Sequence, residues 1–175
     1  MQIKVCLHNI RSTYNVGAIL RTCEGFGVSE AVFSGYTPRV HDEELLPHLR
    51  EKLDRQISKT ALGAENLVKC STTSDITDTI AEYHKQGWQI VGLENNLQDE
   101  RLCLLNDPNL KSKLNDQVFL LLGEEVEGIP KSLYDQIDLF LEIPMQGQKE
   151  SFNVSVATGV ALYALSMLNV RPIRR

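Results

Sequence analysis

The stretch Leu120-Leu-Leu-Gly123-Glu-Glu125-Val-Glu-Gly128-Ile-Pro130 joins a run of apolar residues to a loop with two glycines. A continuous apolar run is typical of a strand that is buried on both faces of a sheet. The predicted strands are residues 3–7, 31–34, 89–93, 118–122 and 139–143. Helical patterns alternate with them at residues 16–26, 73–86, 130–134 and 154–168. This alternation predicts an α/β fold with a mostly parallel sheet flanked by helices.

The composition narrows the class of protein further. The chain has 175 residues, 42% of them hydrophobic and 23% charged, which excludes a disordered, collagen-like or coiled-coil protein. This length predicts one domain, residues 1–175. A net charge of −5 excludes a uniformly basic coat for nucleic acid, although it allows a local basic patch. No apolar run approaches the ~20 residues of a membrane span, and the N-terminus is too short and polar for a signal peptide.

The cysteines indicate neither a disulfide framework nor a metal site. Cys6, Cys23, Cys70 and Cys103 form no CxxC pair, so we expect no bound metal. We interpret them as reduced, buried thiols of a cytoplasmic protein. Two polar stretches, residues 35–56 and 95–117, are predicted loops, which are either functional or plain surface excursions.

The first candidate constellation is Asn9-Ile-Arg-Ser-Thr-Tyr-Asn15-Val-Gly17-Ala-Ile-Leu-Arg21-Thr22, between a strand and a helix. Asn15 is the predicted N-cap of that helix. Gly17 leaves room for a ligand or another backbone to approach. Arg21 lies four residues further on the same face, where it is either functional or paired at the surface with Glu24.

The second constellation is the opening stretch, in which a buried strand ends in Gly-x-Glu-x-x-Gly. Ligands of α/β proteins bind beyond the carboxyl ends of strands, so Gly123 suits close backbone contact there. The glycine patterns of dinucleotide-binding and phosphate-binding loops are absent. Glu124, Glu125 and Glu127 would repel a phosphate and suit a neutral or cationic ligand, or they are simply solvated acids.

The third constellation is Ile143-Pro-Met-Gln-Gly147-Gln-Lys-Glu-Ser151-Phe-Asn153-Val154. Asn153 is the predicted N-cap of the helix that follows, and Ser151 can offer a hydroxyl to a ligand. Taken alone, both residues could serve only as caps. The helix is apolar nearly all round, so we expect it to be buried on more than one side, for instance in an oligomer.

In this order and spacing, the three constellations resemble the SpoU-type (TrmH-like) RNA 2′-O-ribose methyltransferases of the SPOUT superfamily. The resemblance covers residues 5–168, and the stretch Lys59-Thr-Ala-Leu-Gly-Ala-Glu65 adds to it. One departure is Phe152, where the family usually has Leu. The resemblance implies a single minimal catalytic domain with a C-terminal trefoil knot, which the pattern alone would never predict.

The resemblance also implies a reaction and a set of site residues. The cofactor would be S-adenosylmethionine, bound by Leu93, Gly123, Ile143, Met145, Ser151 and Asn153. Its methyl group would pass to a ribose 2′-hydroxyl, in a homodimer whose subunits both contribute to each active site. The implied catalytic residues are Arg21, Asn15, Glu125 and Ser151. An arginine normally keeps its proton, so Arg21 would act either as a strongly perturbed base or by stabilising the developing alkoxide.

The implied RNA substrate, a tRNA or rRNA, requires local positive charge. Arg11, Arg39 and Lys59 are the predicted RNA-binding residues, and the C-terminal Arg171, Arg174 and Arg175 add to the basic side chains. Acidic residues between them dilute the patch, so we expect modest, salt-sensitive affinity. Alternatives are an RNA base methyltransferase of the same superfamily and an inactive cofactor-binding or RNA-binding module. A nicotinamide dehydrogenase lacks its glycine fingerprint here.

Overall fold

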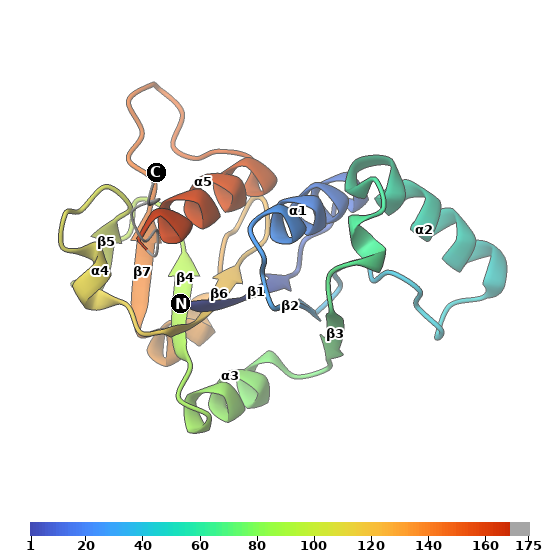
Figure 1. Ribbon diagram of the computed structural model, residues 1–175, viewed down its shortest axis with the longest axis horizontal. Coiled ribbons are helices and arrows are strands. Elements are labelled where there is room, and N and C mark those ends of the chain that lie inside the picture. The colour runs from blue at the N-terminus through green and yellow to red at the C-terminus, as the bar shows by residue number, and fades with distance from the viewer. Residues whose placement is uncertain (169–175) are drawn as a thin grey trace, which may run out of the picture.

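The computed structural model describes residues 1–168, and a seven-stranded sheet forms the centre of this part of the chain (Figure 1). The strand order is β3-β2-β1-β6-β4-β7-β5. The strands are β1 (Gln2–His8), β2 (Glu30–Ser34), β3 (Cys70–Thr73), β4 (Gln89–Leu93), β5 (Leu102–Leu104), β6 (Gln117–Leu122) and β7 (Leu139–Glu142). All the pairings between these strands are parallel, which confirms the predicted α/β fold.

Helices cover both faces of this sheet (Figure 1). On one face lie α1 (Thr13–Gly25) and α5 (Val154–Met167), with α2 (Pro47–Ala61) packed against α1. On the other lie α3 (Ile76–Lys85) and the 3-10 helix η2 (Lys131–Gln136). The short helices η1 (Ala64–Asn66) and α4 (Leu110–Lys113) complete the described elements. The trefoil knot that the resemblance implies stays a prediction.

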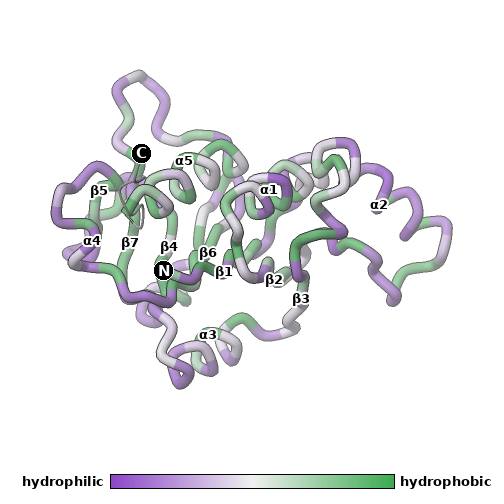
Figure 2. The backbone as a smooth tube through the Cα atoms, in the orientation of Figure 1, coloured by the Kyte–Doolittle hydropathy of each residue, from purple (hydrophilic) through white to green (hydrophobic). Residues whose placement is uncertain are grey.

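The apolar strands are buried on both faces, as their sequences predict. In β1, Val5 and Leu7 join the core beneath α1 and α5, whereas Cys6 joins the core beneath α3. Successive side chains of a strand point to opposite faces, so an unbroken apolar run serves two cores. Figure 2 shows the hydrophobic colour along the central strands and the hydrophilic colour along much of α2 and α3.

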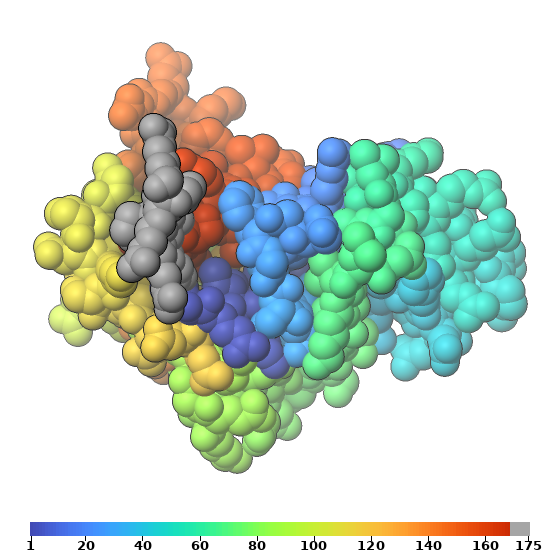
Figure 3. Space-filling view, viewed as in Figure 1, coloured from blue at the N-terminus to red at the C-terminus, as the bar shows by residue number. Residues whose placement is uncertain are grey.

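Five of the described elements lie where the sequence predicts none. The helices α2 and α4 fall largely in the two predicted loops, η1 is an additional 3-10 turn, and β3 and β5 are additional strands. Only Ile57 and Ala61 of α2 are buried, so its apolar stripe is too narrow to stand out. Figure 3 shows α2 (teal) at one end of the molecule. Most of its side chains therefore face solvent, which explains its polar sequence. β3 has the sequence CSTT, without the apolar run of the central strands.

One other expectation needs correction, that for Cys70, and the expected burial of α5 on more than one side stays a prediction. Cys6, Cys23 and Cys103 are buried free thiols, but Cys70 is only partly buried. α5 buries one face, with Thr158, Ala161, Leu162 and Leu165. Val156, Val160, Tyr163 and Met167 recur at helical spacing and are 39–58% exposed in the single chain. For α5 to be buried on more than one side, a partner would have to cover these exposed side chains.

Candidate functional site

A cavity of about 320 Å³ lies beyond the carboxyl ends of β4 and β6. This volume is near the lower end of the range for small-molecule sites, about 300–1,000 Å³. Its lining comes from the two strand ends, the turn after β6 and the segment that leads into α5. These residues are Leu93, Glu94, Asn95, Asn96, Leu97, Leu122, Gly123, Glu124, Glu125, Val126, Glu127, Gly128, Tyr134, Glu150, Ser151, Phe152, Val154 and Ala157.

The turn after β6 folds back on itself. The backbone amide and carbonyl of Glu124 exchange hydrogen bonds of 3.0 Å with those of Gly128. A Cβ atom at Gly123 would lie 2.2 Å from the carbonyl carbon of Gly128, so only glycine fits this crossing. Gly128 itself has φ +71°, a left-handed conformation that favours glycine. The backbone in close contact with Gly123 is thus the turn itself, whereas the predicted contact with a ligand stays a prediction.

Glu125 projects from this turn onto the N-terminus of α1. Its carboxylate accepts hydrogen bonds from the backbone amides of Arg11 (3.2 Å) and Ser12 (3.1 Å) and from Asn15 Nδ2 (3.1 Å). Burial by itself would raise the pKa of Glu125, but these hydrogen bonds outweigh it and hold the pKa below its ordinary value. Glu125 is therefore an anchored carboxylate beside the cavity.

Asn15 connects this anchor to the third constellation. Its Oδ1 accepts a hydrogen bond from Asn153 Nδ2 at 3.2 Å. Asn153 is the N-cap of α5, as predicted, because its Oδ1 accepts from the Ser155 amide at 2.9 Å. The prediction that Asn15 caps α1 is wrong: Ser12 is the N-cap, and its side chain accepts from the Asn15 amide. The side-chain amide of Asn15 is therefore free to bridge Glu125 and Asn153.

The remaining predicted cofactor-binding residues divide into two groups. Leu93, Gly123 and Ser151 line the cavity. Ile143, Met145 and Asn153 do not line it. The carbonyl of the buried Ile143 accepts a hydrogen bond of 3.0 Å from Asn95 Nδ2, so Ile143 supports a lining residue. Met145 is partly buried in the segment between β7 and α5.

Arg21 stands apart from the cavity within one chain. It is exposed on α1 and lies outside the cavity lining, and its side chain makes no hydrogen bond or ion pair with any of the described residues. The surface pair with Glu24 does not form there. Gly17, on the same helix, receives another backbone: a Cβ at Gly17 would lie 2.3 Å from the Ile57 carbonyl oxygen of α2.

The predicted RNA-binding residues lie in different parts of the structure and have different partners. Arg11 pairs with Glu124 at 3.3 Å and Arg39 with Glu44 at 3.4 Å. Lys59 is exposed in the last turn of α2. Arg171, Arg174 and Arg175 lie outside the described residues. Of this set, Arg11 bonds directly to a residue of the cavity lining.

Sequence reasoning missed Glu94, Asn95 and Asn96, which directly follow β4 and line the cavity. Glu94 is partly buried and accepts hydrogen bonds from the backbone amides of Ile129 and Asn95. Burial raises the pKa of Glu94 despite these hydrogen bonds. The rule that drew attention to Gly123, polar residues or glycine directly after a buried strand, would have found all three.

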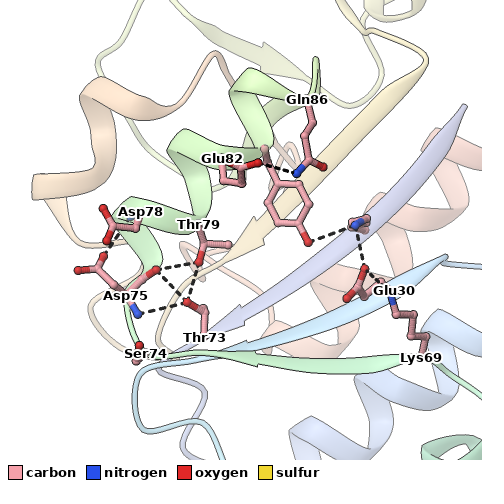
Figure 4. A pocket seen from close by; sticks show the side chains of 11 residues that line it. Glu30, Lys69, Thr73, Ser74, Asp75, Asp78, Thr79, Glu82 and Gln86 are labelled. Atoms are coloured by element: carbon pink, nitrogen blue, oxygen red, sulfur yellow. Dashed lines mark hydrogen bonds and ion pairs between the residues drawn. The ribbon is translucent and has the colours of Figure 1, made fainter.

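A second cavity, of about 500 Å³, lies between α3 and the strands β1 to β3 (Figure 4). Its polar groups are bonded to one another. Lys4 pairs with Glu30 at 2.8 Å and donates to the Tyr83 hydroxyl at 3.1 Å, and Lys69 also reaches Glu30. Figure 4 shows Thr73, Asp75 and Thr79 joined in a network at the start of α3. This cavity contains none of the three constellations, so the smaller cavity is the candidate site.

Two structural features are absent from residues 1–168. No group of three or more His, Cys, Asp or Glu side chains in this range could hold a metal ion. No helix in this range is long and apolar enough to cross a membrane.

Comparison with known proteins adds a family match. The model of the SpoU rRNA Methylase family matches residues 2–163. An uncharacterized tRNA/rRNA methyltransferase of Borreliella burgdorferi is 30% identical over 161 residues, which are 91% of this chain and 61% of that protein. The tRNA (guanosine(18)-2'-O)-methyltransferase of Mus musculus is 28% identical over 151 residues, 85% of this chain and 8% of that protein.

Solved structures show the same fold. The AdoMet-bound rRNA methyltransferase from Sinorhizobium meliloti superposes with a TM-score of 0.77 at 21% identity. The superposition covers 97% of this chain and 57% of that one. The chain thus spans well under two thirds of the length of these similar proteins.

Proposed function

The chain belongs to the SpoU rRNA Methylase family, and from this premise we propose that it is an S-adenosylmethionine-dependent RNA methyltransferase acting on the 2′-hydroxyl of a ribose in tRNA or rRNA. One observation carries the proposal. Three stretches far apart in the sequence meet beside one cavity, through hydrogen bonds of Asn15 with Glu125 and with Asn153. The name of the mouse relative supports ribose over a base as the target.

The cavity fits the cofactor in its chemistry. Apolar side chains such as Leu97 and Phe152 suit an adenine ring, and the close turn at Gly123 brings backbone groups to the cavity wall. Leu93, Gly123 and Ser151 would hold the cofactor directly, whereas Ile143, Met145 and Asn153 would shape the loops around it. When bound, S-adenosylmethionine supplies an electrophilic methyl group on its sulfonium sulfur.

The side chains of this chain would prepare the acceptor. A ribose hydroxyl is a poor nucleophile until its proton is withdrawn. Arg21 would stabilise the negative charge that develops on the ribose oxygen as the hydroxyl proton passes to solvent water and the methyl group leaves the sulfonium. Glu125 and Asn15 would hold the start of α1, the helix that carries Arg21, in a fixed position. Ser151 would orient the ribose or the guanidinium from the cavity wall.

A second copy of the chain would complete the site. Arg21 does not line the cavity of its own chain, and the exposed apolar side chains of α5 form a face that a second copy can cover. We therefore propose a homodimer in which Arg21 of one protomer serves the cavity of its partner. Arg11, Arg39 and Lys59 would contact RNA phosphates, with an affinity that falls as salt rises.

Mapping of the methylated product tests this function. The protein is incubated with bulk tRNA and rRNA and with methyl-labelled cofactor, and the RNA is digested to nucleosides. Label on the ribose supports the proposal. Label on a base nitrogen, with none on ribose, would identify a base methyltransferase instead. Cofactor binding without label on any RNA would identify an inactive binding module.

A further inference from the structure

Glu94 is a partly buried carboxylate in the cavity wall that pairs with no cation among the described residues. Its hydrogen-bond donors are the backbone amides of Ile129 and Asn95. Within residues 1–168, no Lys, Arg or His forms an ion pair with it. The neighbouring acids are better compensated, because Glu124 pairs with Arg11 and Glu125 accepts from three donors.

The fold itself does not require this negative charge. A neutral amide oxygen could accept the same hydrogen bond from Ile129, since backbone amides bond to any oxygen acceptor. A carboxylate withdrawn from water without a cation is costly, and burial raises the pKa of Glu94 accordingly. The same lack of compensation makes this position favourable for a positive charge that a ligand brings.

The rest of the cavity lining also carries negative charge. Five of its lining residues are carboxylates, Glu94, Glu124, Glu125, Glu127 and Glu150, and none is Lys, Arg or His. Glu127 and Glu150 are exposed, so water and salt screen them. Glu94 and Glu125 are both partly buried and pair with no cation within residues 1–168. Hydrogen bonds hold the pKa of Glu125 below its ordinary value, whereas burial raises the pKa of Glu94, so Glu94 is the less compensated of the two. A neutral ligand gains little from this arrangement, whereas a cation gains much.

We propose that Glu94 supplies the negative charge by which the cavity distinguishes the cationic methyl donor from its neutral product. This inference rests on the proposed function, because it takes S-adenosylmethionine as the donor. The donor carries a sulfonium and an ammonium against one carboxylate, so it is a net cation. After transfer, S-adenosylhomocysteine keeps only the ammonium and the carboxylate. Glu94 thus favours the donor and eases exchange of the spent cofactor.

Binding measurements on the purified chain test this role without any turnover. Calorimetry gives the Kd of S-adenosylmethionine, S-adenosylhomocysteine and the neutral 5′-methylthioadenosine for the wild type and for Glu94→Gln. We expect the wild type to bind the donor at least tenfold more tightly than the product. In Glu94→Gln the donor should weaken roughly tenfold, while the two other ligands change less than threefold. Glu100→Gln, which removes an exposed carboxylate outside the cavity, is the matched control and should change none of the three.

Each contrary outcome has its own meaning. Equal weakening of all three ligands in Glu94→Gln would show that Glu94 only holds the turn. Equal weakening of donor and product in Glu94→Gln would place Glu94 beside the ammonium group that both ligands carry. No weakening of either ligand would show that Glu94 does not contribute to binding. Each of these three outcomes overturns the proposal. A wild type that binds product as tightly as donor overturns it even if the variant does not fold. Failure of the wild type to bind any of the three would instead refute the proposed function.

Discussion

At the residue scale, Asn153 joins two features with one short side chain. Its Oδ1 caps α5 through the amide and hydroxyl of Ser155, and its Nδ2 donates to Asn15 in α1. An N-cap needs only the oxygen of the amide group, so the nitrogen is free to contact a second helix. Local helix formation and assembly of the site therefore depend on the same residue.

Asn153→Ala should lower both stability and donor affinity. Loss of the cap and of the bond to Asn15 should reduce the free energy of unfolding by about 1–2 kcal/mol. Because the segment before α5 lines the cavity, the Kd of the donor should rise several-fold. Urea denaturation and calorimetry measure the two effects. Asp75→Ala, which removes the cap of α3, should cost about 1 kcal/mol and leave the Kd of the donor unchanged. If Asp75→Ala raised the Kd as much as Asn153→Ala does, a specific role of Asn153 at the cavity would be contradicted.

Arg21→Ala should keep donor affinity and abolish turnover. Arg21 lies outside the cavity lining, so the donor should bind with an unchanged Kd. Methyl transfer should fall by a factor of a hundred or more, because a lost charge-stabilising donor costs about 10²–10³ in rate. Single-turnover transfer to RNA measures the loss, and Lys85→Ala, an exposed lysine of α3, is the control. Wild-type rates in Arg21→Ala would refute the catalytic assignment.

At the element scale, close packing of α1 on α2 positions the first constellation. Gly17 lets the two helices approach until the Ile57 carbonyl and the Thr60 side chain occupy the space of a Cβ atom. Thr60 Oγ1 also donates to the Tyr14 carbonyl at 2.9 Å. The first turn of α1 is thereby held by α2 on one side and by Glu125 and Asn153 on the other.

Gly17→Ala should therefore destabilise the chain although alanine is the better helix former. Its Cβ would lie 2.3 Å from a backbone oxygen, which cannot move without shifting α2. We expect a loss of about 1–3 kcal/mol in thermal or urea unfolding, as for other overpacked sites. Gly25→Ala in the same helix has nothing within 4 Å of its Cβ and should be neutral or slightly stabilising. Equal stabilities of the two variants would contradict this packing.

The strands β1 and β2 are joined by a buried ion pair that sets a dependence on acid. Burial would raise the pKa of Glu30, but its hydrogen bonds with Lys4, Ser71 and Lys69 hold the pKa below its ordinary value of 4.5. A carboxyl with a lowered folded-state pKa stabilises the fold above its unfolded pKa. That stability is lost as the pH falls through the folded value.

Glu30→Gln should lose roughly 3 kcal/mol of stability at pH 7, because it leaves the partly buried Lys4 without its counter-charge. As the pH falls through the lowered pKa of Glu30, the difference from the wild type should shrink, since Glu30 then becomes protonated in the folded wild type as well. Urea denaturation between pH 2 and 7 measures both effects. Glu44→Gln, from an exposed pair with Arg39, should stay within about 0.5 kcal/mol. A pH-independent loss would contradict the ion-pair explanation.

At the scale of the whole molecule, the exposed apolar stripe on α5 and the position of Arg21 both favour a second copy of the chain. The stripe consists of Val156, Val160, Tyr163 and Met167. Phe26, at the end of α1, packs edge-on against Tyr163 at 6.5 Å between ring centroids, so the apolar surface continues from α5 onto α1. Arg21 lies on this same helix, α1. A second copy covering the surface would thus approach Arg21.

Val160→Glu should separate the proposed dimer into monomers. A charge in the middle of the apolar stripe would have to be buried without a partner. Sedimentation should give a dimer for the wild type at micromolar concentration and a monomer for Val160→Glu, with loss of methyl transfer. Leu67→Glu, 72% exposed and outside the stripe, should remain dimeric. An active wild-type monomer would contradict the shared site.

The sequence by itself determined the elements whose signal is local. Apolar runs specified the central strands, because a parallel strand covered by helices must be apolar on both faces. The Gly123–Gly128 turn and the cap at Asn153 were predictable, since each depends on residues within a few positions. A polar helix such as α2 escaped prediction because only two of its side chains reach the core.

Only the tertiary structure decided which side chains meet. Asn15 bonds to partners 110 and 138 residues away, and this choice depends on strand order and helix packing. The same holds for Glu94, because the lack of a cation beside it among residues 1–168 is a property of how distant segments pack. Local propensity fixes the conformation of a few neighbouring residues, whereas partners across a sheet are fixed by how the whole chain packs.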